Sequence, residues 1–336
     1  MSASKRDIAG FVKNLPRTLL LHDFLPTIVV LFYLGFCLVS PHFRSIENLI
    51  NILKQSSYLT ILATAQLIVL ITRGFDLSVG TVIGMISVAS SLAMAAVVKG
   101  NPEAIGLAIL LGWVVGLSIG FAVGAANGFT VAYLGVSPFI ATLGMMGIAL
   151  GFASTISKGF PVYNVPGAFV NVFNRSSVIG IPIPVVICGL VLVAIYFFLN
   201  WTVFGRSLYI LGSNQRLAHV AGLRARFYLA GAYVVCSLLV AVVALVLTAR
   251  TGTGEPRLGV NLMFESLVAA ILGGVSLGGG EGRILHCIIG SLFVTLLSNA
   301  MDMVRVNSNI QMMAMGVILI VSIFLERLRM RLEVGR

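Results

Sequence analysis

A carboxylate and a hydroxyl lie together in a short segment that interrupts two apolar stretches. The segment is Arg73-Gly74-Phe75-Asp76-Leu77-Ser78-Val79-Gly80, and it follows an apolar run at 57–72. A break flanked by glycines frees backbone groups that can bind polar solutes, and Asp76 or Ser78 is also a suitable N-cap for the next helix. The residues therefore predict either a helix break that contacts a solute or a simple turn with a capping side chain.

A second glycine-rich segment has a related pattern. It is Gly273-Gly274-Val275-Ser276-Leu277-Gly278-Gly279-Gly280-Glu281-Gly282-Arg283. At an offset of 200 residues it repeats Gly74, Leu77 and Gly80 of the first segment as Gly274, Leu277 and Gly280. The three identities suggest that the two breaks are equivalent points of an internal repeat, a common feature of transporters.

The second segment also matches a nucleophile motif by its spacing. Gly274-x-Ser276-x-Gly278 has the form of a nucleophile elbow, and His286 follows ten residues after Ser276. That motif requires a strand, a tight turn and a helix, whereas here it follows an apolar helical run. We therefore interpret the match as chance, and we expect no catalytic residue in the chain.

A third segment is basic and contains no acid. Residues 202–226 include Arg206, Arg216, Arg224 and Arg226. Within it, the residues from Asn214 to Ala221 suit a short surface helix that ends at Gly222. The segment predicts either a positive-inside signal or a docking surface for a cytoplasmic protein.

The composition places these segments in a membrane protein. Of 336 residues, 58% are hydrophobic and 10% are charged, whereas about a quarter are charged in soluble domains. A charge at the bilayer centre costs about 2.5–3.5 kcal/mol, so charges mark the ends of spans. Uncharged runs lie at 24–43, 55–72, 77–98, 104–157, 176–205, 227–249, 266–280, 284–301 and 306–325.

These runs predict an all-α polytopic protein with about ten transmembrane helices and Gly-rich breaks. A helix crosses the hydrocarbon core in about 20 residues, so the run at 104–157 must contain two helices. Gly135, Ser137 and Pro138 give the natural break between them.

An even number of spans places both termini on one side of the membrane. With both in the cytoplasm, 14 of the 22 Lys and Arg residues lie inside, in agreement with the positive-inside rule. The whole chain, 1–336, is then a single transmembrane domain. It has a cytoplasmic N-terminal segment at 1–23, a cytoplasmic loop at 201–227 and a cytoplasmic tail at 326–336.

The net charge of +11 follows from this topology, so we expect no nucleic-acid partner. Cys37, Cys188, Cys236 and Cys287 all fall in apolar runs without CxxC spacing. This favours buried thiols over a disulfide framework or a metal site.

With these segments, the chain resembles the permease subunits of ribose-type sugar ABC importers, a family that includes permeases for other pentoses, hexoses, polyols and autoinducer-2. The resemblance covers about residues 45–325, although Arg73 stands where glycine is usual and Glu265 where aspartate is usual. The motifs that carry it are Gly74-Phe75-Asp76-Leu77-Ser78-Val79-Gly80, Asn127-Gly128, Ser137-Pro138-Phe139-Ile140-Ala141-Thr142-Leu143-Gly144, Phe204-Gly205-Arg206, Gly212-Ser213-Asn214, Val220-Ala221-Gly222-Leu223 and Ala269-Ala270-Ile271-Leu272-Gly273-Gly274-Val275-Ser276-Leu277.

The resemblance implies that Phe204–Gly222 docks on an ATPase in the bacterial inner (plasma) membrane. Family members work as two permease copies, or two related permeases, with an ATP-binding subunit and a periplasmic solute-binding protein. The chain contains no G-x-x-x-x-G-K-[ST] sequence, so we expect no cofactor on it and ATP on the partner subunit. The residues that the family pattern assigns to coupling are Phe204, Gly205, Arg206, Asn214, Gln215, Ala218, Gly222 and Leu223.

A route for a neutral sugar needs hydroxyl, amide and aromatic groups more than charges. Each polar candidate equally fits a contact between helices, since small and polar residues are common there. Candidates for the translocation route or for helix breaks are Gly74, Asp76, Ser78, Gly80, Asn127, Pro138, Thr142, Glu265, Gly274, Ser276 and Asn299.

The alternative function is an ion-coupled secondary carrier that uses Asp76 or Glu265. Such carriers place ionisable groups within the spans, whereas here Glu265 alone interrupts an apolar segment and Asp76 borders one. We therefore expect an ATP-driven importer. The residues do not distinguish among solutes, between a homodimer and a heterodimer, or among binding proteins, and they do not fix the membrane depth of the two breaks.

Overall fold

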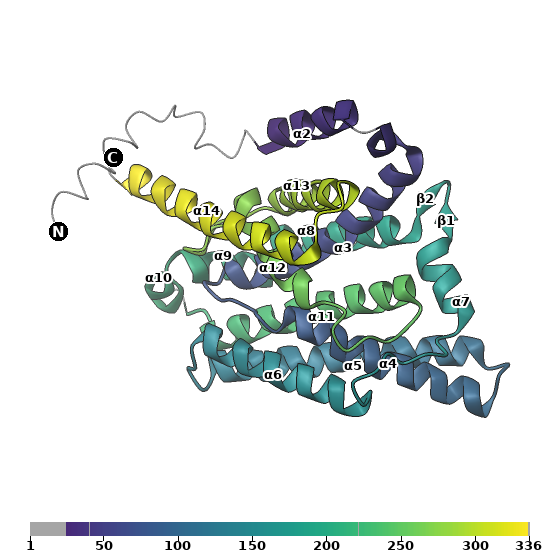
Figure 1. Ribbon diagram of the computed structural model, residues 1–336. Coiled ribbons are helices and arrows are strands. Elements are labelled where there is room, and N and C mark those ends of the chain that lie inside the picture. Colours follow the sequence, from purple (N-terminus) through teal and green to yellow (C-terminus); the bar gives the residue numbers. More distant parts are fainter. Residues whose placement is uncertain (1–24, 40, 221, 335–336) are drawn as a thin grey trace.

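The computed structural model describes residues 25–39, 41–220 and 222–334, so the N-terminal segment expected at 1–23 lies outside it. The described chain is predominantly helical (Figure 1). In chain order the helices are α2 (Leu25–Val39), η3 (Pro41–Arg44), α3 (Ile46–Leu70), α4 (Val79–Gly100), α5 (Ile105–Ala132), α6 (Pro138–Ile156), α7 (Gly167–Val170), η4 (Asn171–Arg175), α8 (Ile183–Trp201), α9 (Val203–Ser213), α10 (Gln215–Val220), α11 (Ala225–Thr251), α12 (Val260–Gly273), α13 (Ile284–Met303) and α14 (Ser308–Val334).

Each expected span coincides with a helix, but only some of these helices are full-length. Within the described residues, six helices are long and apolar enough to cross a bilayer: α4, α5, α6, α8, α11 and α13. Helix α12 has 14 residues, or about 21 Å at 1.5 Å per residue, less than the roughly 30 Å of a bilayer core. The fold class of a polytopic helical membrane protein is confirmed with six clear spans, and ten crossings stay a prediction.

Local signals explain several helix ends. Helix α5 ends at Ala132 and α6 begins at Pro138, with Gly135 at φ 71° between them, so the predicted division of the run at 104–157 is confirmed. Gly252 and Gly274 adopt left-handed conformations directly after α11 and α12, as C-terminal glycines commonly do.

The uncharged run at 176–205 is not one helix. Its first residues form an antiparallel hairpin of β1 (Ser177–Val178) and β2 (Ile181–Pro182), with Ser177 opposite Pro182. The two turn residues, Ile179 and Gly180, have φ values of 53° and 79°, and positive φ at both central positions is typical of a type I′ turn. The expected span therefore begins later, at α8.

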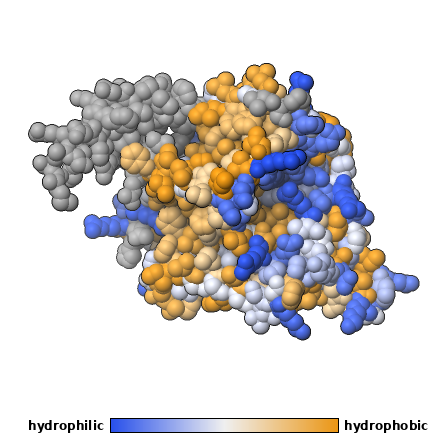
Figure 2. Space-filling view, in the orientation of Figure 1, coloured by the Kyte–Doolittle hydropathy of each residue, from blue (hydrophilic) through white to orange (hydrophobic). Residues whose placement is uncertain are grey.

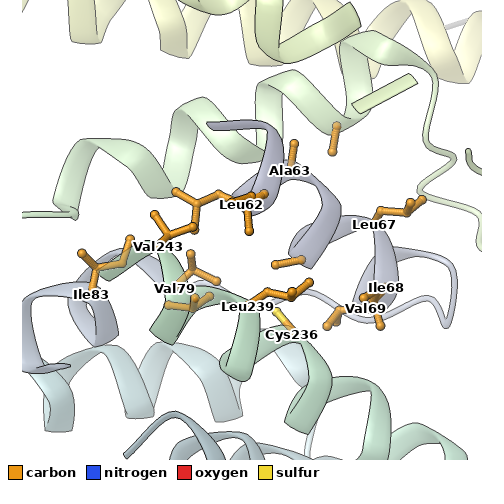
Figure 3. Close-up of a cluster of buried hydrophobic side chains, with 14 of the residues drawn as sticks. Leu62, Ala63, Leu67, Ile68, Val69, Val79, Ile83, Cys236, Leu239 and Val243 are labelled. Atoms are coloured by element: carbon orange, nitrogen blue, oxygen red, sulfur yellow. The ribbon is translucent and has the colours of Figure 1, made fainter. Parts of the chain in front are cut away.

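The core lies where α3, α4 and α11 pack together. Over an 18-residue apolar stretch of each helix, 61% of the residues are buried in α4 and in α11. In α6 only 17% are buried. Figure 3 shows side chains of this core, including Leu62 and Ile68 of α3, Ile83 of α4 and Val243 of α11. These three helices form the centre of the described bundle, while α5, α6 and α8 lie at its periphery.

The short elements lie at opposite ends of the bundle. In Figure 1, α10 and the C-terminal end of α14 lie at the left, and the β1–β2 hairpin and α7 lie at the right. Figure 2 shows broad apolar areas on this face, with many hydrophilic side chains toward the right. The tail expected at 326–336 continues α14 as far as Val334.

The helix contacts form two similar sets. In one set, α4 packs on α5 and α6, and α11 contacts α4 and α5. In the other, α12 packs on α13 and α14, and α3 contacts α12 and α13. This pattern matches α3–α6 with α11–α14, so the segment 71–78 corresponds to 252–259. The repeat predicted at an offset of 200 residues, which paired 73–80 with 273–283, is therefore not supported.

Candidate functional site

The break between α3 and α4 is held together by its own carboxylate. Ser78 occupies the N-cap position of α4 but makes no side-chain capping bond. Instead, Asp76 Oδ1 accepts hydrogen bonds from the Ser78 backbone N–H at 2.9 Å and from the Ser78 hydroxyl at 2.6 Å. The acceptor oxygen of Asp76 therefore lies at the positive end of the α4 dipole, which is a favourable position for an acceptor.

Side chains from other helices complete this cluster. Asn127 of α5 donates to Ser78 Oγ at 3.1 Å, and Gln66 of α3 donates to the Asp76 carbonyl oxygen at 2.9 Å. Tyr233 of α11 donates to the Phe75 carbonyl oxygen at 3.3 Å. Asp76 is only 1% exposed, so this arrangement joins four helices at a buried point. Of the two predicted capping residues, Ser78 makes no capping bond and Asp76 accepts from the backbone N–H of Ser78. Contact of the break with a solute stays a prediction.

The first residues of α4 also make a very close backbone contact. Gly80 packs against Gly259, directly before α12, and a Cβ on either glycine would lie 2.5 Å from the other's carbonyl oxygen. Only glycine allows this approach. The starts of α4 and α12 thus meet inside the bundle, which no motif in the sequence indicated.

The remaining route candidates do not gather at one place. Pro138 begins α6 and accepts a hydrogen bond from Thr142 on the same helix, and Ser276 accepts one from the backbone N–H of Gly278 in its own loop. Glu265 is half-buried within α12. In this conformation the candidates are dispersed over several helices, and Gly274 acts as the left-handed cap of α12.

Asn299 has a clear structural partner. It exchanges two hydrogen bonds with Asn48 of α3, at 3.1 and 2.9 Å, and both side chains are buried. Asn48 also donates to the Phe43 carbonyl oxygen at 3.0 Å. These contacts favour the helix-joining role of Asn299 over a place in the route.

The short helix predicted from Asn214 to Ala221 is present as α10, although Ala221 itself lies outside the described residues, and a second helix, α9, which the sequence did not indicate, precedes it. Thr202 caps α9 by accepting a hydrogen bond from the Gly205 N–H at 3.0 Å. Helix α10 follows, Gly222 takes φ 70°, and the Leu223 N–H donates to the Ala218 carbonyl oxygen at 3.0 Å. Asn214 precedes α10 and accepts from the backbone N–H of Arg216, and α10 begins at Gln215.

Packing explains the Phe204-Gly205-Arg206 motif. Phe204 lies among aromatic rings of α8 and α11, with centroids 5.3 Å from Phe198 and 5.1 Å from Tyr228. A Cβ on Gly205 would overlap the backbone of α8, while Arg206 is exposed. The first two residues therefore fix α9 against the spans, and the third is free to meet a partner.

Helix α9 is also bonded to both glycine-rich breaks. Arg73 donates to carbonyl oxygens at the end of α9, and the Tyr209 hydroxyl donates to the Gly282 carbonyl oxygen at 2.9 Å. Burial raises the pKa of Tyr209, so its hydroxyl stays protonated as a donor. The sequence indicated the two breaks and the basic segment separately. No pattern in it indicated that they contact each other, because the residues involved lie far apart in the chain.

Within the described residues, no group of three or more His, Cys, Asp and Glu side chains could hold a metal ion. Cys37, Cys188, Cys236 and Cys287 are free thiols, of which Cys37 is half-buried and the others are buried. The buried thiols predicted from the sequence are confirmed at three of the four positions.

Residues 48–323 match the family described as branched-chain amino acid transport system / permease component. The D-allose transport system permease protein of Escherichia coli strain K12 is 32% identical over 291 residues, which cover 86% of each chain. The ribose import permease protein of the same strain is also 32% identical, over 86% of this chain and 88% of its own.

The galactose/methyl galactoside import permease protein of Haemophilus influenzae is 29% identical over 90% of this chain and 93% of its own. No solved structure matches the chain. The match covers most of the chain, including both breaks and the α9–α10 segment, so the chain belongs to this family of importer permease components, multi-pass proteins of the inner membrane.

Proposed function

We propose that this chain is the membrane-spanning subunit of an ATP-driven importer for a sugar or a similar small polyhydroxy solute. The observation that carries the proposal is its similarity, over nearly its whole length, to ribose, D-allose and galactose import permeases. Transport is by alternating access, powered by a separate ATPase subunit. The chain itself carries no catalytic residue and no cofactor.

The segment α9–α10 is the ATPase-docking surface in this proposal. It is bounded by Phe204 and Leu223, and Arg206 and Arg216 are exposed along it. Val220 at the end of α10 is 84% exposed, whereas Ala218 is fully buried. An exposed apolar residue beside basic ones suits a protein partner, and the buried alanine keeps α10 fixed to the rest of the chain.

The assembly follows from the same proposal. Two copies of this chain, or this chain and a related one, cross the membrane together, each with about ten crossings and both termini in the cytoplasm. A periplasmic solute-binding protein delivers the solute at the end of the bundle that carries the β1–β2 hairpin. The ATPase binds at the opposite end, where α10 lies.

The test is uptake by proteoliposomes that contain this chain, the ATPase subunit that co-purifies with it and the binding protein of the same importer. Radiolabelled ribose, D-allose, galactose and leucine are the probes, the last because of the family description. We expect uptake of one sugar that requires ATP and the binding protein.

Uptake driven by a pH or sodium gradient, without ATPase and binding protein, would show the ion-coupled carrier instead. ATP-dependent uptake of leucine alone would keep the importer and reject the sugar. A Walker-A lysine variant of the ATPase is the matched control, since it should abolish uptake without changing this chain.

A further inference from the structure

A cavity opens between α8 and α13, and we call it the α8–α13 cavity. Its volume is about 740 Å³, within the roughly 300–1,000 Å³ of ordinary ligand sites. Helices α8 and α13 both pack on α3, and the cavity is the space left between them. Tyr209 of α9 also lines it, so three helices contribute to its walls.

The last residues of α8 and the first of α13 lie at the same end of this cavity. Helix α9 follows α8 directly, and the Tyr209 hydroxyl on α9 donates to the Gly282 carbonyl oxygen at 2.9 Å, just before α13. Arg283 comes next and is exposed. Burial raises the pKa of Tyr209 and the positive charge of Arg283 opposes this rise, so the guanidinium lies near the hydroxyl.

The lining is polar at this end and apolar away from it. Arg283, Tyr209 and Asn200 contribute the polar groups, whereas Leu192 and Ile288 lie deeper along α8 and α13. From Leu192 to Asn200, α8 rises about 12 Å at 1.5 Å per residue, close to half of the roughly 30 Å hydrocarbon core. Within the described residues, no acidic side chain lines the cavity. Its polar end therefore carries a positive charge, and its depth is that of one leaflet.

Aromatic residues at the end of α8 mark the level of the membrane surface. Tyr196, Phe197 and Trp201 are all exposed, and the ring centroids of Phe197 and Trp201 lie 6.0 Å apart. Tyrosine and tryptophan are enriched where the hydrocarbon core meets the lipid headgroups. The polar end of the cavity thus lies at the headgroup level, and its apolar part lies at the level of the acyl chains.

We infer that the α8–α13 cavity binds an anionic phospholipid, with the phosphate at Arg283 and an acyl chain along Leu192 and Ile288. A guanidinium donates two parallel charge-assisted bonds to a phosphate, and the start of α13 presents the positive end of a helix dipole to it. Basic pockets between membrane helices on the cytoplasmic side bind such headgroups.

The inference requires neither the solute nor the ATPase. Only its assignment to the cytoplasmic leaflet rests on the orientation proposed above. Binding of a lipid and transport of a sugar are therefore tested separately.

The experiment is native mass spectrometry of the full chain, delipidated in detergent and titrated with dioleoyl-phosphatidylglycerol. Dioleoyl-phosphatidylcholine is the matched lipid, since it has the same acyl chains and no net charge. We expect one phosphatidylglycerol molecule to bind per chain, several-fold more tightly than phosphatidylcholine.

Variants at the polar end test the role of charge. Arg283→Gln should weaken phosphatidylglycerol binding about tenfold or more, because the charge-assisted bonds are lost. Arg283→Lys should give an intermediate affinity, since an ammonium keeps the charge without the planar fork. Leu285→Glu places a carboxylate at an exposed lining position and should also weaken binding. An acid in the first turn favours a helix, so α13 should keep its fold.

Arg305→Gln is the matched control. Arg305 follows α13 at its other end and is exposed. The substitution changes the net charge by the same amount as Arg283→Gln and Leu285→Glu, so the affinity for phosphatidylglycerol should stay unchanged. The melting temperature of each variant without added lipid shows whether its fold is intact.

The occupant in the membrane is identified by placing the photoreactive residue p-benzoyl-phenylalanine at position 285. After irradiation of native membranes, the purified chain should carry an adduct with the mass of a phospholipid, and Arg283→Gln should reduce its yield. An adduct with a second permease chain or another protein in its place would overturn the inference.

Three results of the titration would also overturn it. They are equal affinity for the two lipids, unchanged affinity in both Arg283→Gln and Leu285→Glu, and displacement of phosphatidylglycerol by inorganic phosphate, which would indicate a site for a soluble anion. None of these measurements depends on transport, so a failure of the proposed sugar uptake would leave them unchanged.

Discussion

Asp76 provides the acceptor that fastens the start of α4, and the same carboxylate is the group an ion-coupled carrier would need. Asp76 accepts two hydrogen bonds from Ser78, Asn127 donates to the Ser78 hydroxyl, and Gln66 donates to the Asp76 carbonyl oxygen. A residue placed in this way positions a helix. Because asparagine keeps the acceptor oxygen at this position, we expect Asp76→Asn to affect transport more than the amount of folded protein.

We predict that Asp76→Asn lowers ATP-driven uptake several-fold while the amount of protein in the membrane stays near the unchanged level. Asparagine keeps an acceptor oxygen and is itself a good cap, but it removes the ionisable carboxyl group from the N-terminus of α4. The measurements are uptake in proteoliposomes and immunoblotting of membranes. Glu103→Gln, the same carboxyl-to-amide change at an exposed turn, is the control. Equal loss of uptake and of protein amount in Asp76→Asn would show that Asp76 has only a structural role.

The Asn48–Asn299 pair makes a prediction about stability. Asn299→Ala should lower the free energy of unfolding by about 1 kcal/mol, because Asn48 is left buried without this partner. Adding Asn48→Ala should cost little more, giving a coupling energy of about 0.6 kcal/mol or above, the average found between membrane helices. Unfolding in detergent mixtures measures both, and strictly additive losses would contradict the pair.

At the scale of elements, α10 has a buried residue that packs against the rest of the chain and an exposed residue that a partner can contact. Ala218 is fully buried, and Val220 is 84% exposed. A change at Ala218 therefore acts on the chain itself by displacing α10, whereas a change at Val220 acts on whatever binds there. The two positions therefore separate the folding of α10 from the docking role that we propose for it.

We predict that Val220→Glu weakens co-purification with the ATPase and lowers uptake without altering thermal stability. Ala218→Glu should lower uptake and also lower the melting temperature, since a carboxylate at a fully buried position is costly. Membrane insertion should be unchanged in both, because neither lies in a span. Unchanged uptake together with unchanged co-purification in both variants would reject docking through α10.

For the whole molecule, the distribution of apolar surface indicates what surrounds it. In helices α5, α6 and α8, only 17–22% of the residues in the 18-residue apolar stretch are buried. They expose large residues such as Ile148 and Leu190, 63% and 67% accessible. Lipid and a second permease chain are the surroundings that such faces fit, because neither water nor a soluble partner would favour them.

The orientation of the bundle is tested by labelling with a membrane-impermeant maleimide. Ile179→Cys in the β1–β2 hairpin is 97% exposed and should react in intact spheroplasts. Val220→Cys should react only after the membrane is opened, because we place α10 in the cytoplasm. The reverse pattern would invert the topology and remove the ATPase from α9–α10.

The sequence by itself determined the class of molecule, because the scarcity of charge and the length of the apolar runs act through solvation, which composition records. It also located the helix ends at Gly135–Pro138 and Gly222, where local backbone preferences decide. The hairpin at 177–182 and the bounds of α12 escaped the charge markers, since hydropathy does not distinguish a short helix or a turn from a span.

Only the tertiary structure decided which segments meet. The bonds from Arg73 to α9, the contact of Gly80 with Gly259 and the pairing of Asn48 with Asn299 join positions separated by more than a hundred residues. The residue types at these points were visible in the sequence as a cation, glycines and amides. Their partners depended on how the helices cross, which is a property of packing over the whole chain and leaves no pattern at any one position.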